Sequence, residues 1–550
     1  MKLSGSQIIL RVLREKNIDT LFGYPGGAVI PFFDALYDEL DYFKVFRPAH
    51  EQNGVHAADG YARSTGKLGV FIATSGPGAT NTITGIANAY MDSVPMLVIS
   101  GQVANTLIGK DSFQEVDITG MTLSVTKHNY LVRRVEDVED VVREAVKVAM
   151  EGRPGPVLVD IPKDVFMKVC EYKGSSEDME NEKTVPSSES LEMAADLINK
   201  AKKPVIYAGG GVRISKNDAL LLKLVEKTDI PVCNSFMGLG TIPRKHRLSL
   251  GFVGMHGFTE TNMAVTNCDL LIAVGARFSD RVIGSPDKFA KGAKIIHIDV
   301  DSTEVDKNTY ESLPLLGDMK SILEKLLDMS EEKDRSSWLE EIMSKKQKNS
   351  LEGQFVPENI LKEVNKHYDK NTVVATDVGQ HQMWTGQYWN FNKSNEFITS
   401  GGLGTMGFGI GAAIGAQVGN PNKKTVLVTG DGSFRMNCQE LVTISKYKLP
   451  IKIVLLNNNT LGMVRQWQRM FSNGKYSETD NLDDVNYQKL AAAYNIKSYK
   501  AESLEELKNA LNESSNLNEP ILLECKIDHD CSVYPIVPPG RPIDELLISG

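Results

Sequence analysis

Runs of β-branched and aliphatic residues recur along the whole chain, and each leads through a glycine or polar loop into a stretch with helical spacing. The clearest runs lie at residues 425–429 and 451–456, in GVFIATSGPG from residue 69, in PVIYAGGG from residue 204 and in KIIHIDVD from residue 294. Strands of a parallel sheet are buried on both faces and therefore appear as continuous apolar runs, and helices connect them. The alternation predicts parallel sheets of the α/β class.

Two segments near opposite ends of the chain share one layout. In the first, a strand ends at Ser75-Gly76-Pro77-Gly78, a helical stretch follows, and a second strand runs from Pro95 to Ser100. The second segment repeats this order with Gly430-Asp431-Gly432-Ser433 and Pro450, at the same interval between loop and proline. We interpret the echo as two similar βαβ-based domains, with coincidence as the alternative because βαβ units are common.

The chain is too long for a single core, and polar segments indicate where its domains end. At 550 residues it exceeds the size at which one hydrophobic core stops growing. The charged, serine-rich residues 171–190 and the charged helical stretch at 329–355 are typical of connectors. We therefore predict three doubly wound α/β domains with parallel sheets, at residues 1–172, 190–345 and 355–550.

Composition and charge disfavour several classes of function. Hydrophobic residues make up 41% and charged residues 24% of the chain, and its net charge of −9 disfavours nucleic acid or an anionic membrane as the main partner. No apolar run is long enough for a transmembrane helix, and the first residues predict an amphipathic helix capped near Ser4 or Ser6 rather than a signal peptide. The six cysteines lack metal-type spacing and indicate reduced thiols, so we expect a cytoplasmic protein.

The most informative side chains lie where two predicted strands end. The strand at 425–429 leads into Gly430-Asp431-Gly432, and the strand at 451–456 ends at Asn457-Asn458. The carboxyl ends of neighbouring parallel strands share one edge of a sheet, where open α/β folds bind ligands. A carboxylate with amide oxygens suits Mg²⁺, and the glycines let a diphosphate approach the backbone. Gly-Asp-Gly alone would indicate a simple turn, whereas the Asn pair favours a metal site.

These two motifs are the signature of thiamine diphosphate enzymes, and the rest of the chain resembles one branch of them. The further motifs are HEQNG from His50, SGGLGTMGFG from Ser400, GMHG from Gly254, GARFSDR from Gly275 and RQWQ from Arg465. Together they are similar to the acetohydroxyacid synthase (acetolactate synthase) large subunits over nearly the whole chain. The resemblance implies a pyrimidine-binding, a central FAD-type and a diphosphate-binding domain, in that order.

The resemblance assigns catalytic roles to three residues. Glu51 would hydrogen-bond N1′ of the cofactor's aminopyrimidine as a protonated acid, although a lone glutamate at a helix start is otherwise an ordinary first-turn acid. The Gly404 carbonyl would accept from the 4′-amino group. Met406 would lie between the two cofactor rings and impose their bent arrangement, which suits an adaptable apolar side chain.

The resemblance also extends the metal and diphosphate site. Asp431, Asn458 and the main-chain carbonyl of Thr460 are the implied Mg²⁺ ligands. The implied contacts of thiamine diphosphate are Val378, Gly379, Gln380, His381, Gly430, Gly432, Ser433, Gly462 and Met463. The alternative for His381 is a core histidine without a ligand.

A flavin site is implied in the middle domain. Gly209-Gly210-Gly211 after a strand is a weak phosphate-loop signal that alone would indicate a turn. The implied FAD contacts are Arg153, Gly209, Gly210, Gly211, Met255, His256, Gly275, Arg277, Asp299 and Asp318. Ser279 departs from the family's usual RFDD motif, whereas Asp280 and Arg281 remain. In this family FAD takes no redox part in the main reaction.

Substrate selection is assigned by the same resemblance. The implied substrate contacts are Phe113, Gln114, Lys163, Arg281 and Trp467. Arg281 offers a guanidinium fork for a 2-ketoacid carboxylate, and Trp467 would favour the larger ketoacid as acceptor. The alternatives for these two residues are a surface ion pair and an ordinary core tryptophan.

The implied reaction is decarboxylation of pyruvate and condensation with a second 2-ketoacid. Pyruvate as acceptor gives 2-acetolactate and 2-ketobutyrate gives 2-aceto-2-hydroxybutyrate, the first common step of branched-chain amino acid synthesis. The resemblance further implies a homodimer or homotetramer with sites at subunit interfaces, and a small regulatory subunit.

Three rival functions remain to be weighed. They are a flavin-free catabolic acetolactate synthase, a flavin-redox pyruvate oxidase and a catalytically inactive homologue that only binds a nucleotide or a partner. The FAD motifs and Trp467 argue against the first, and the resemblance around Gln114 and Trp467 argues against the second. The joint presence of Glu51, Asp431 and Asn458 argues against the third.

Overall fold

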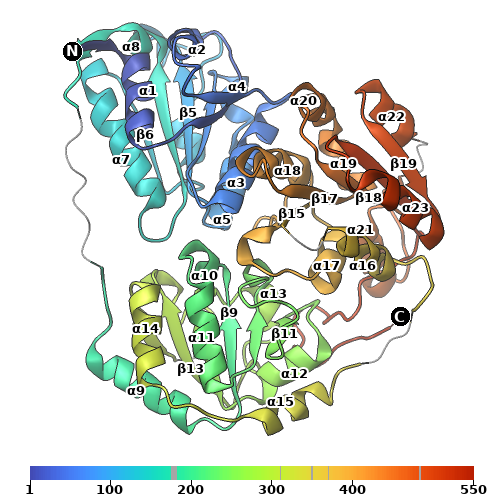
Figure 1. The fold of residues 1–550 in the computed structure, drawn as a ribbon. Helices are drawn as coiled ribbons and strands as arrows, with labels where there is room; N and C mark the ends of the chain where they lie inside the picture. The colour runs from blue at the N-terminus through green and yellow to red at the C-terminus, as the bar shows by residue number, and fades with distance from the viewer. Residues whose placement is uncertain (175–182, 310, 348–350, 369–370, 482–484, 550) are drawn as a thin grey trace.

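Three α/β units, each built on a six-stranded parallel sheet, make up the described part of the chain (Figure 1). The structure is a computed structural model that describes all residues except 175–182, 310, 348–350, 369–370, 482–484 and 550. In Figure 1 the N-terminal unit lies at the upper left, the C-terminal unit at the upper right and the middle unit below both. The predicted fold class is confirmed.

The N-terminal sheet has the strand order β3-β2-β4-β5-β7-β6. Its strands are β2 (Thr20–Gly23), β3 (Lys44–Phe46), β4 (Gly69–Ala73), β5 (Met96–Gln102), β6 (His128–Leu131) and β7 (Pro156–Pro162). Its helices are α1 (Gly5–Glu15), α2 (Ile30–Tyr37), α3 (Glu51–Thr65), α4 (Pro77–Thr80), α5 (Ile83–Met91), α6 (Ile118–Thr122), α7 (Val138–Met150) and α8 (Lys163–Met167). A short antiparallel pair, β1 (Lys2–Ser4) and β8 (Val169–Glu171), joins the two ends of the unit. Ser4 caps α1 through a full capping box, so the first of the two predicted caps is the one present.

The C-terminal sheet, β16-β15-β17-β18-β20-β19, repeats this order strand for strand. Its strands are β15 (Thr372–Thr376), β16 (Phe397–Ile398), β17 (Lys424–Gly430), β18 (Lys452–Asn457), β19 (Lys497–Ala501) and β20 (Ile521–Lys526). Its helices are α16 (Pro357–His367), α17 (Gln380–Tyr388), α18 (Phe408–Gly419), α19 (Asp431–Asn437), α20 (Leu441–Lys446), α21 (Gly462–Phe471), α22 (Tyr487–Ala493) and α23 (Leu504–Ser514). In both sheets the second strand in chain order lies at one edge and the fifth at the other. The internal echo therefore reflects two units of one topology.

The middle sheet has a different order, β11-β10-β9-β12-β13-β14. Its strands are β9 (Pro204–Ala208), β10 (Val232–Asn234), β11 (Ser249–Phe252), β12 (Leu270–Val274), β13 (Lys294–Asp299) and β14 (Leu313–Leu316). Its helices are α9 (Ser188–Lys200), α10 (Gly210–Ile214), α11 (Asp218–Thr228), α12 (Thr259–Asn267), α13 (Asp280–Ile283), α14 (Met319–Met329) and α15 (Ser336–Met343). In chain order this is 3-2-1-4-5-6, the order of dinucleotide-binding sheets, with the switch point between β9 and β12.

The two predicted connectors differ in structure. Part of the first, residues 175–182, lies outside the described residues, and α9 begins inside its last residues. The second contains α15, whose Trp338 is buried and donates from Nε1 to the carbonyl of Pro204 at 3.1 Å. The helical connector predicted there is therefore packed against the middle unit rather than lying free.

Helices α3 and α18 join the N-terminal unit to the C-terminal unit in the centre of the molecule (Figure 1). Small residues let the two backbones approach closely: a Cβ on Gly415 would lie 1.8 Å from the carbonyl oxygen of Ala57, and one on Gly60 would lie 2.1 Å from that of Ala412. A single hydrophobic cluster continues from Phe71 on β4 to Phe408 on α18. These two units therefore share one core.

A buried ion-pair network crosses the same junction. Arg63 on α3 pairs with Asp59 and with Asp92, and its Nη1 donates to the carbonyl of Thr399 at 2.9 Å. Asp92 in turn accepts from the backbone N–H groups of Gly401 at 3.0 Å and Gly402 at 2.7 Å. Such charges are tolerated inside a protein only when they are paired and hydrogen-bonded. The network fixes the loop that leads to Gly404 and Met406.

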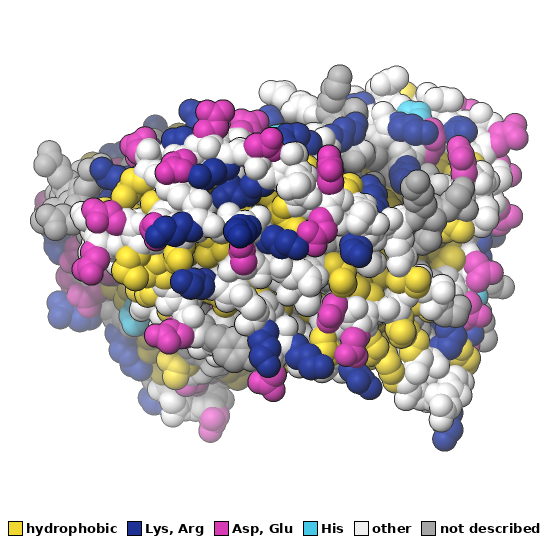
Figure 2. Space-filling model, turned by 90° about the horizontal axis from the view of Figure 1, so that it is seen from below, with side chains coloured by type: hydrophobic (Ala, Val, Ile, Leu, Met, Phe, Trp, Pro, Cys, Tyr) yellow, Lys and Arg dark blue, Asp and Glu magenta, His cyan; other side chains and the backbone are white. Residues whose placement is uncertain are grey.

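Positively and negatively charged side chains are mixed on the face of the molecule that Figure 2 shows. Figure 2 shows basic and acidic side chains interspersed over the lower face, with hydrophobic side chains between them. Among the described residues, no helix combines the length and the apolar character needed to cross a membrane. The six cysteines are free thiols, as predicted.

The close contact of α3 and α18 gives a first testable prediction. Gly415→Ala should lower the free energy of unfolding by about 2–3 kcal/mol, because the added methyl group meets the backbone of Ala57 and the helices must separate. Gly27→Ala is the matched control, since a Cβ at Gly27 meets no atom within 4 Å, and its change should stay within about 0.5 kcal/mol. Chemical denaturation measures both. Equal effects of the two substitutions would contradict the contact.

Candidate active site at the edge of the C-terminal sheet

The predicted metal-binding residues lie at the carboxyl ends of two paired strands. β17 and β18 are parallel neighbours, with Gly430 opposite Leu456 in the register. Asp431 begins α19 directly after β17, and Asn458 follows β18. Both side chains are buried. The strand pairing that the sequence predicted is therefore present, and it places carboxylate and amide at one edge.

Three oxygen atoms converge at this edge. Oδ1 of Asn458 lies 3.0 Å from the carbonyl oxygen of Thr460 and 3.2 Å from Oδ1 of Asp431. Turning the Asn458 amide by 180° would place its NH₂ group between these oxygens. Whether the oxygen or the nitrogen points inward therefore decides what the site can bind.

A chain of amide hydrogen bonds settles this orientation. Asn458 Nδ2 donates to Gln380 Oε1 at 3.3 Å, and Gln380 Nε2 donates to Gln466 Oε1 at 3.0 Å and to the carbonyl of Cys531 at 2.7 Å. Gln466 is fixed by the backbone of Val533, whose N–H it accepts at 2.9 Å and whose carbonyl its Nε2 meets at 3.0 Å. Reversing Asn458 would set two oxygens against each other at Gln380. The amide relay therefore turns the Asn458 oxygen toward Asp431 and Thr460.

This oxygen set fits a hard divalent cation. The other carboxylate oxygen of Asp431, Oδ2, accepts from Asn481 Nδ2 at 2.9 Å. Burial raises the pKa of Asp431, because the carboxylate loses water and gains few partners. A cation between the three oxygens would reverse that effect. One carboxylate, one amide oxygen and one backbone carbonyl are the few protein ligands that Mg²⁺ takes when phosphate and water complete its shell.

A pocket opens beside the three oxygens and contains most of the predicted diphosphate contacts. It is lined by Val378, Gly379, Gln380, His381, Trp384, Met406, Gly430, Asp431, Gly432, Ser433, Leu456, Asn458, Thr460, Leu461, Gly462, Met463 and Val464. Helices α17 and α21 both begin here, and the N-terminus of a helix favours anions. A Cβ at Gly462 would lie 2.0 Å from Gln380 Oε1 and one at Gly430 would lie 2.9 Å from His381 Nδ1, so a larger residue at either position would displace a side chain of the pocket.

His381 forms one wall of this pocket as a neutral imidazole. Burial lowers its pKa to about 3, and its Nε2 is buried without a hydrogen-bond partner among the described residues. An unsatisfied buried nitrogen costs free energy unless a ligand or water completes it. The geometry therefore supports a polar ligand group here over the alternative of a core histidine.

Glu51 and the predicted acceptor residues of the N-terminal unit lie at a different sheet edge. Glu51 begins α3, and its Oε2 accepts from Asn81 Nδ2 at 3.0 Å, with Gly78 alongside. A Cβ on Gly76 would lie 2.9 Å from Gln114, which therefore borders the same edge. Phe113 is 88% exposed. Lys163, at the start of α8, is exposed as well.

The two edges do not meet in one pocket of a single chain. Every residue that lines the pocket beside Asp431 comes from the C-terminal unit, and Glu51 is not among them. Gly404 has a left-handed φ of 72° and lies in an exposed turn. The structure thus brings Met406 to the metal edge, whereas Glu51 is half-buried at the edge of the N-terminal sheet and Gly404 is exposed.

In the middle unit, the predicted flavin glycines meet at the switch point of the sheet. A Cβ on Gly209 would lie 2.1 Å from the carbonyl oxygen of Gly275, and one on Gly211 would lie 2.7 Å from Gly275 Cα. Gly209 and Gly211 follow β9, and Gly275 follows β12. The crevice at such a switch point is where dinucleotides bind to sheets of this order.

The other predicted flavin residues have partners of their own within the protein. Burial lowers the pKa of His256 to about 4 and raises the pKa of Asp299, so burial disfavours the charged form of both side chains. Asp318 caps α14 by accepting from the N–H of Ser321 at 2.9 Å, and the Arg277 carbonyl accepts from Tyr207. Arg153 instead pairs with two acids after β13, Asp301 at 3.0 Å and Glu304 at 2.7 Å.

Arg281 and Trp467 are brought together from different units, as their shared predicted role requires. Arg281 on α13 lies with its guanidinium carbon 5.9 Å from the ring centre of Trp467 on α21. Its backbone carbonyl accepts from Met255, and Nη1 approaches the Met255 sulfur at 3.6 Å. Trp467 Nε1 is buried without a partner among the described residues. Arg281 is exposed and its Nε also lies 3.6 Å from Asp280 Oδ2, so the alternative of a surface ion pair stays open, whereas Trp467 is half-buried rather than part of the core.

Several residues that shape the site were not predicted. They are Asn81, Glu440, Gln466 and Asn481. Glu440 accepts from the N–H groups of Ala49 and His50 and so holds the loop before Glu51. Gln466 lies inside the RQWQ motif beside Trp467, and only its polarity on an otherwise core-facing position of α21 could have drawn attention to it.

Comparisons with known proteins agree with this geometry. Three family profiles match, described as thiamine pyrophosphate enzyme, N-terminal TPP binding domain at residues 3–121, central domain at 191–326 and C-terminal TPP binding domain at 377–525. The chain is 44% identical to a probable acetolactate synthase large subunit of Methanocaldococcus jannaschii, over 99% of this chain and 95% of that protein. It is 42% identical to the acetolactate synthase large subunit of Lactococcus lactis, over 99% and 96%. It is 44% identical to the acetolactate synthase isozyme 2 large subunit of Escherichia coli K12, over 99% of each chain.

The amide relay gives a second prediction. Gln466→Leu should weaken binding of a divalent cation about tenfold, because Gln380 loses its partner and Asn458 is no longer held with its oxygen inward. Electron paramagnetic resonance of Mn²⁺ measures the affinity without any assay of activity. Gln417→Leu is the control, since Gln417 is an equally buried glutamine of the same unit that donates to two carbonyls away from the site. Unchanged Mn²⁺ affinity in Gln466→Leu would contradict the relay.

Proposed function

The chain belongs to the thiamine pyrophosphate enzymes and, within them, to the acetolactate synthase large subunits, and on this premise we propose its substrates, cofactor set and assembly. It is a thiamine diphosphate-dependent acetolactate synthase. The proposed substrates are pyruvate as donor and pyruvate or 2-ketobutyrate as acceptor, giving 2-acetolactate or 2-aceto-2-hydroxybutyrate. The observation that carries the proposal is that oxygens of Asp431, Asn458 and Thr460 converge beside the pocket at which helices α17 and α21 begin.

Mg²⁺ is the proposed metal, held by the three converging oxygens. Asp431 supplies the charge, while Asn458 and Thr460 supply neutral oxygens whose positions are fixed by the relay and the backbone. Two diphosphate oxygens and a water would complete an octahedral shell. His381 and the N-termini of α17 and α21 face the same pocket and favour an anionic group there.

Thiamine diphosphate supplies an electron sink that permits loss of CO₂ from a 2-ketoacid and carbon–carbon bond formation. The protein's own contribution is to position and to move protons. Met406 lines the pocket and would hold the two rings at an angle. Glu51 would donate a proton to N1′ of the aminopyrimidine, and the carbonyl of Gly404 would accept from its 4′-amino group.

We propose a homodimer, or a tetramer built from it, in which each site combines two chains. Glu51 and the pocket beside Asp431 occupy different edges of one chain, so a complete site requires the partner subunit's Glu51. Large apolar side chains stand exposed near both edges, among them Phe113 at 88% and Leu403 at 43%. Burial against a second chain would explain them.

FAD is the proposed third cofactor, at the switch point of the middle sheet. The strand order of that sheet and the close approach of Gly209, Gly211 and Gly275 support a dinucleotide there. Met255, His256, Arg277, Asp299 and Asp318 are the further proposed contacts, together with Arg153, which pairs with Asp301 and Glu304. A bound flavin would set this chain apart from a flavin-free catabolic acetolactate synthase.

Arg281 and Trp467 are proposed to select the acceptor. The guanidinium can hold a carboxylate in two hydrogen bonds, and the indole offers an apolar face beside it. Gln114, Phe113 and Lys163 would approach from the partner subunit's edge, as Glu51 does. The domain bounds proposed are 1–172, 190–345 and 355–550. The name "large subunit" of the relatives supports a small regulatory subunit as a partner, and we propose a cytoplasmic location.

One experiment separates the proposed function from its rivals. The purified chain, reconstituted with thiamine diphosphate, Mg²⁺ and FAD and then freed of unbound FAD, should be yellow and should convert pyruvate to acetolactate without consuming oxygen. Oxygen uptake coupled to pyruvate loss would identify a pyruvate oxidase instead. Full activity in a colourless protein would identify the catabolic type, and no turnover at all would indicate an inactive homologue.

The shared site predicts complementation between inactive variants. Glu51→Gln and Asp431→Ala should each abolish acetolactate formation as homodimers, because one lacks the proton donor and the other the metal ligand. Refolded together as mixed dimers, they should regain activity, since one of the two sites then holds an intact Glu51 and an intact Asp431. The measurement is activity of verified mixed dimers. Continued inactivity would place the whole site within one chain.

Acceptor choice gives a further prediction. Trp467→Leu should leave acetolactate formation largely intact but lower the preference for 2-ketobutyrate about tenfold, because the extra methylene loses about 1 kcal/mol of apolar contact. Arg281→Lys should impair both acceptors, since a point charge does not replace the guanidinium fork. Phe471→Leu is the control, because Phe471 packs against Trp467 at 5.4 Å between ring centres without facing Arg281. A product ratio unchanged by Trp467→Leu would make the tryptophan structural.

A further inference from the structure

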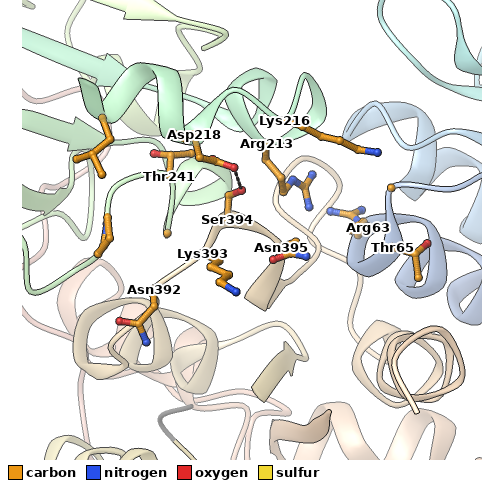
Figure 3. A pocket seen from close by; sticks show the side chains of 15 residues that line it. Arg63, Thr65, Arg213, Lys216, Asp218, Thr241, Asn392, Lys393, Ser394 and Asn395 are labelled. Carbon is orange, nitrogen blue, oxygen red and sulfur yellow. Dashed lines mark hydrogen bonds between the residues drawn. The ribbon is translucent and has the colours of Figure 1, made fainter. Parts of the chain in front are cut away.

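A second cavity, separate from the active site, lies where all three units meet (Figure 3). Its volume is about 480 Å³, within the range of small-molecule sites. It is lined by Arg63, Thr65 and Gly66 of the N-terminal unit, by Arg213, Lys216, Asp218, Ala219, Leu222, Gly240, Thr241 and Pro243 of the middle unit, and by residues 392–395 of the C-terminal unit. None of the predicted metal, thiamine diphosphate, flavin or substrate residues is among them.

The cavity is strongly cationic. Arg63, Arg213, Lys216 and Lys393 line it, whereas Asp218 is the acid among the lining residues. Arg63 is neutralised from behind by Asp59 and Asp92. Asp218 accepts from Ser394 Oγ at 2.9 Å, the contact dashed in Figure 3, and burial raises the pKa of its carboxyl. Asp59, Asp92 and Asp218 all act on Arg213 electrostatically, but the four cations that line the cavity outnumber these three acids by one.

Arg213 is the most informative of these residues. It is 9% exposed, and its Nε and Nη1 are buried without a hydrogen-bond partner among the described residues. Figure 3 shows the guanidinium between Arg63 and Asn395. Burial and the nearby Arg63 lower the pKa of Arg213 to about 10, so it still carries its charge at neutral pH. A buried guanidinium with two unpartnered nitrogens is costly and is expected where a ligand supplies the missing acceptors.

The remaining lining distinguishes between classes of anion. Lys216 and Lys393 are exposed and take part in no ion pair among the residues described here, so both are free to reach into the cavity mouth. On the other side, Ala219, Leu222 and Pro243 give an apolar wall. Several cations at one end suit a dianion, and a guanidinium fork suits phosphate oxygens in particular. The apolar side chains would gain no contact from an inorganic ion, whereas the organic part of a larger ligand could pack against them.

We propose that this cavity binds a small organic phosphate monoester. The phosphate lies against Arg213 and between Lys216 and Lys393, where it completes the unpartnered guanidinium. The organic part lies along Ala219, Leu222 and Pro243. The site is independent of the proposed catalytic function, since it shares no residue with the metal edge or the flavin crevice.

Calorimetry of the complete protein tests the proposal. The chain is first saturated with thiamine diphosphate, Mg²⁺ and FAD, so that those sites are closed to the probe. Ribose 5-phosphate should bind saturably, inorganic phosphate more weakly and ribose without phosphate not at all. Arg213→Met should raise the Kd for ribose 5-phosphate about tenfold or more. Lys67→Ala is the matched control, because Lys67 is an exposed lysine next to Gly66 that does not line the cavity, and its Kd should stay at the wild-type value.

Other results would overturn the proposal. They are no binding to the wild-type protein at millimolar ribose 5-phosphate, an equal loss of affinity in Lys67→Ala, inorganic phosphate binding as tightly as the monoester, or release of flavin by the probe. Arg213→Met should not lower the thermal midpoint of unfolding, because it removes a buried charge with two unpartnered nitrogens. If Arg213 had only a structural role, the substitution would lower that midpoint. Should that variant fold poorly, Lys216→Ala carries the same test with a several-fold rise in Kd.

Discussion

Three oxygen atoms held together at the end of two strands are the constraint on which the rest of this site depends. Oxygens of Asp431, Asn458 and Thr460 repel one another unless a proton or a cation lies between them, and the amide relay through Gln380 and Gln466 holds the NH₂ group of Asn458 away from the other two oxygens. The fold therefore stores an arrangement that is complete only with a cation present. The neighbouring glycines and helix N-termini then favour the binding of an anion next to such a cation.

The second constraint is that Glu51, the proposed proton donor, and Asp431, the proposed metal ligand, lie at different sheet edges of the chain. The N-terminal and C-terminal sheets have the same strand order and share one core through α3 and α18, yet Glu51 and Asp431 do not line a common pocket. The buried pairs of Arg63 with Asp59 and Asp92 fix the loop before Met406 relative to α3. The duplication thus holds the two sheet edges at a fixed spacing within one chain, and under the proposed dimer each edge would pair with the other edge of a second chain.

Sequence patterns predicted the architecture well because they report local rules. Continuous apolar runs located strands of all three sheets, and the echo around Ser75 and Gly430 corresponds to one topology used twice. Asp431 and Asn458 could be placed together because parallel neighbours share an edge. Gln466 and Glu440 could not be predicted, since their roles arise from hydrogen bonds to Val533 and to Ala49, far away in sequence. The burial of Trp338 could not be predicted either, because the segment around α15 is rich in charged residues and was therefore expected to be a connector.

The central claim is that the three oxygens bind a cation on which the cofactor depends, and titration calorimetry of thiamine diphosphate tests it most directly. Two titrations of the purified chain are compared, one with Mg²⁺ and one with a chelator of divalent cations. The predicted result is saturable binding of one cofactor per chain with Mg²⁺ and loss of measurable binding with the chelator. Equal affinity in the two titrations would contradict the claim, because the diphosphate would then be held without a metal at this edge.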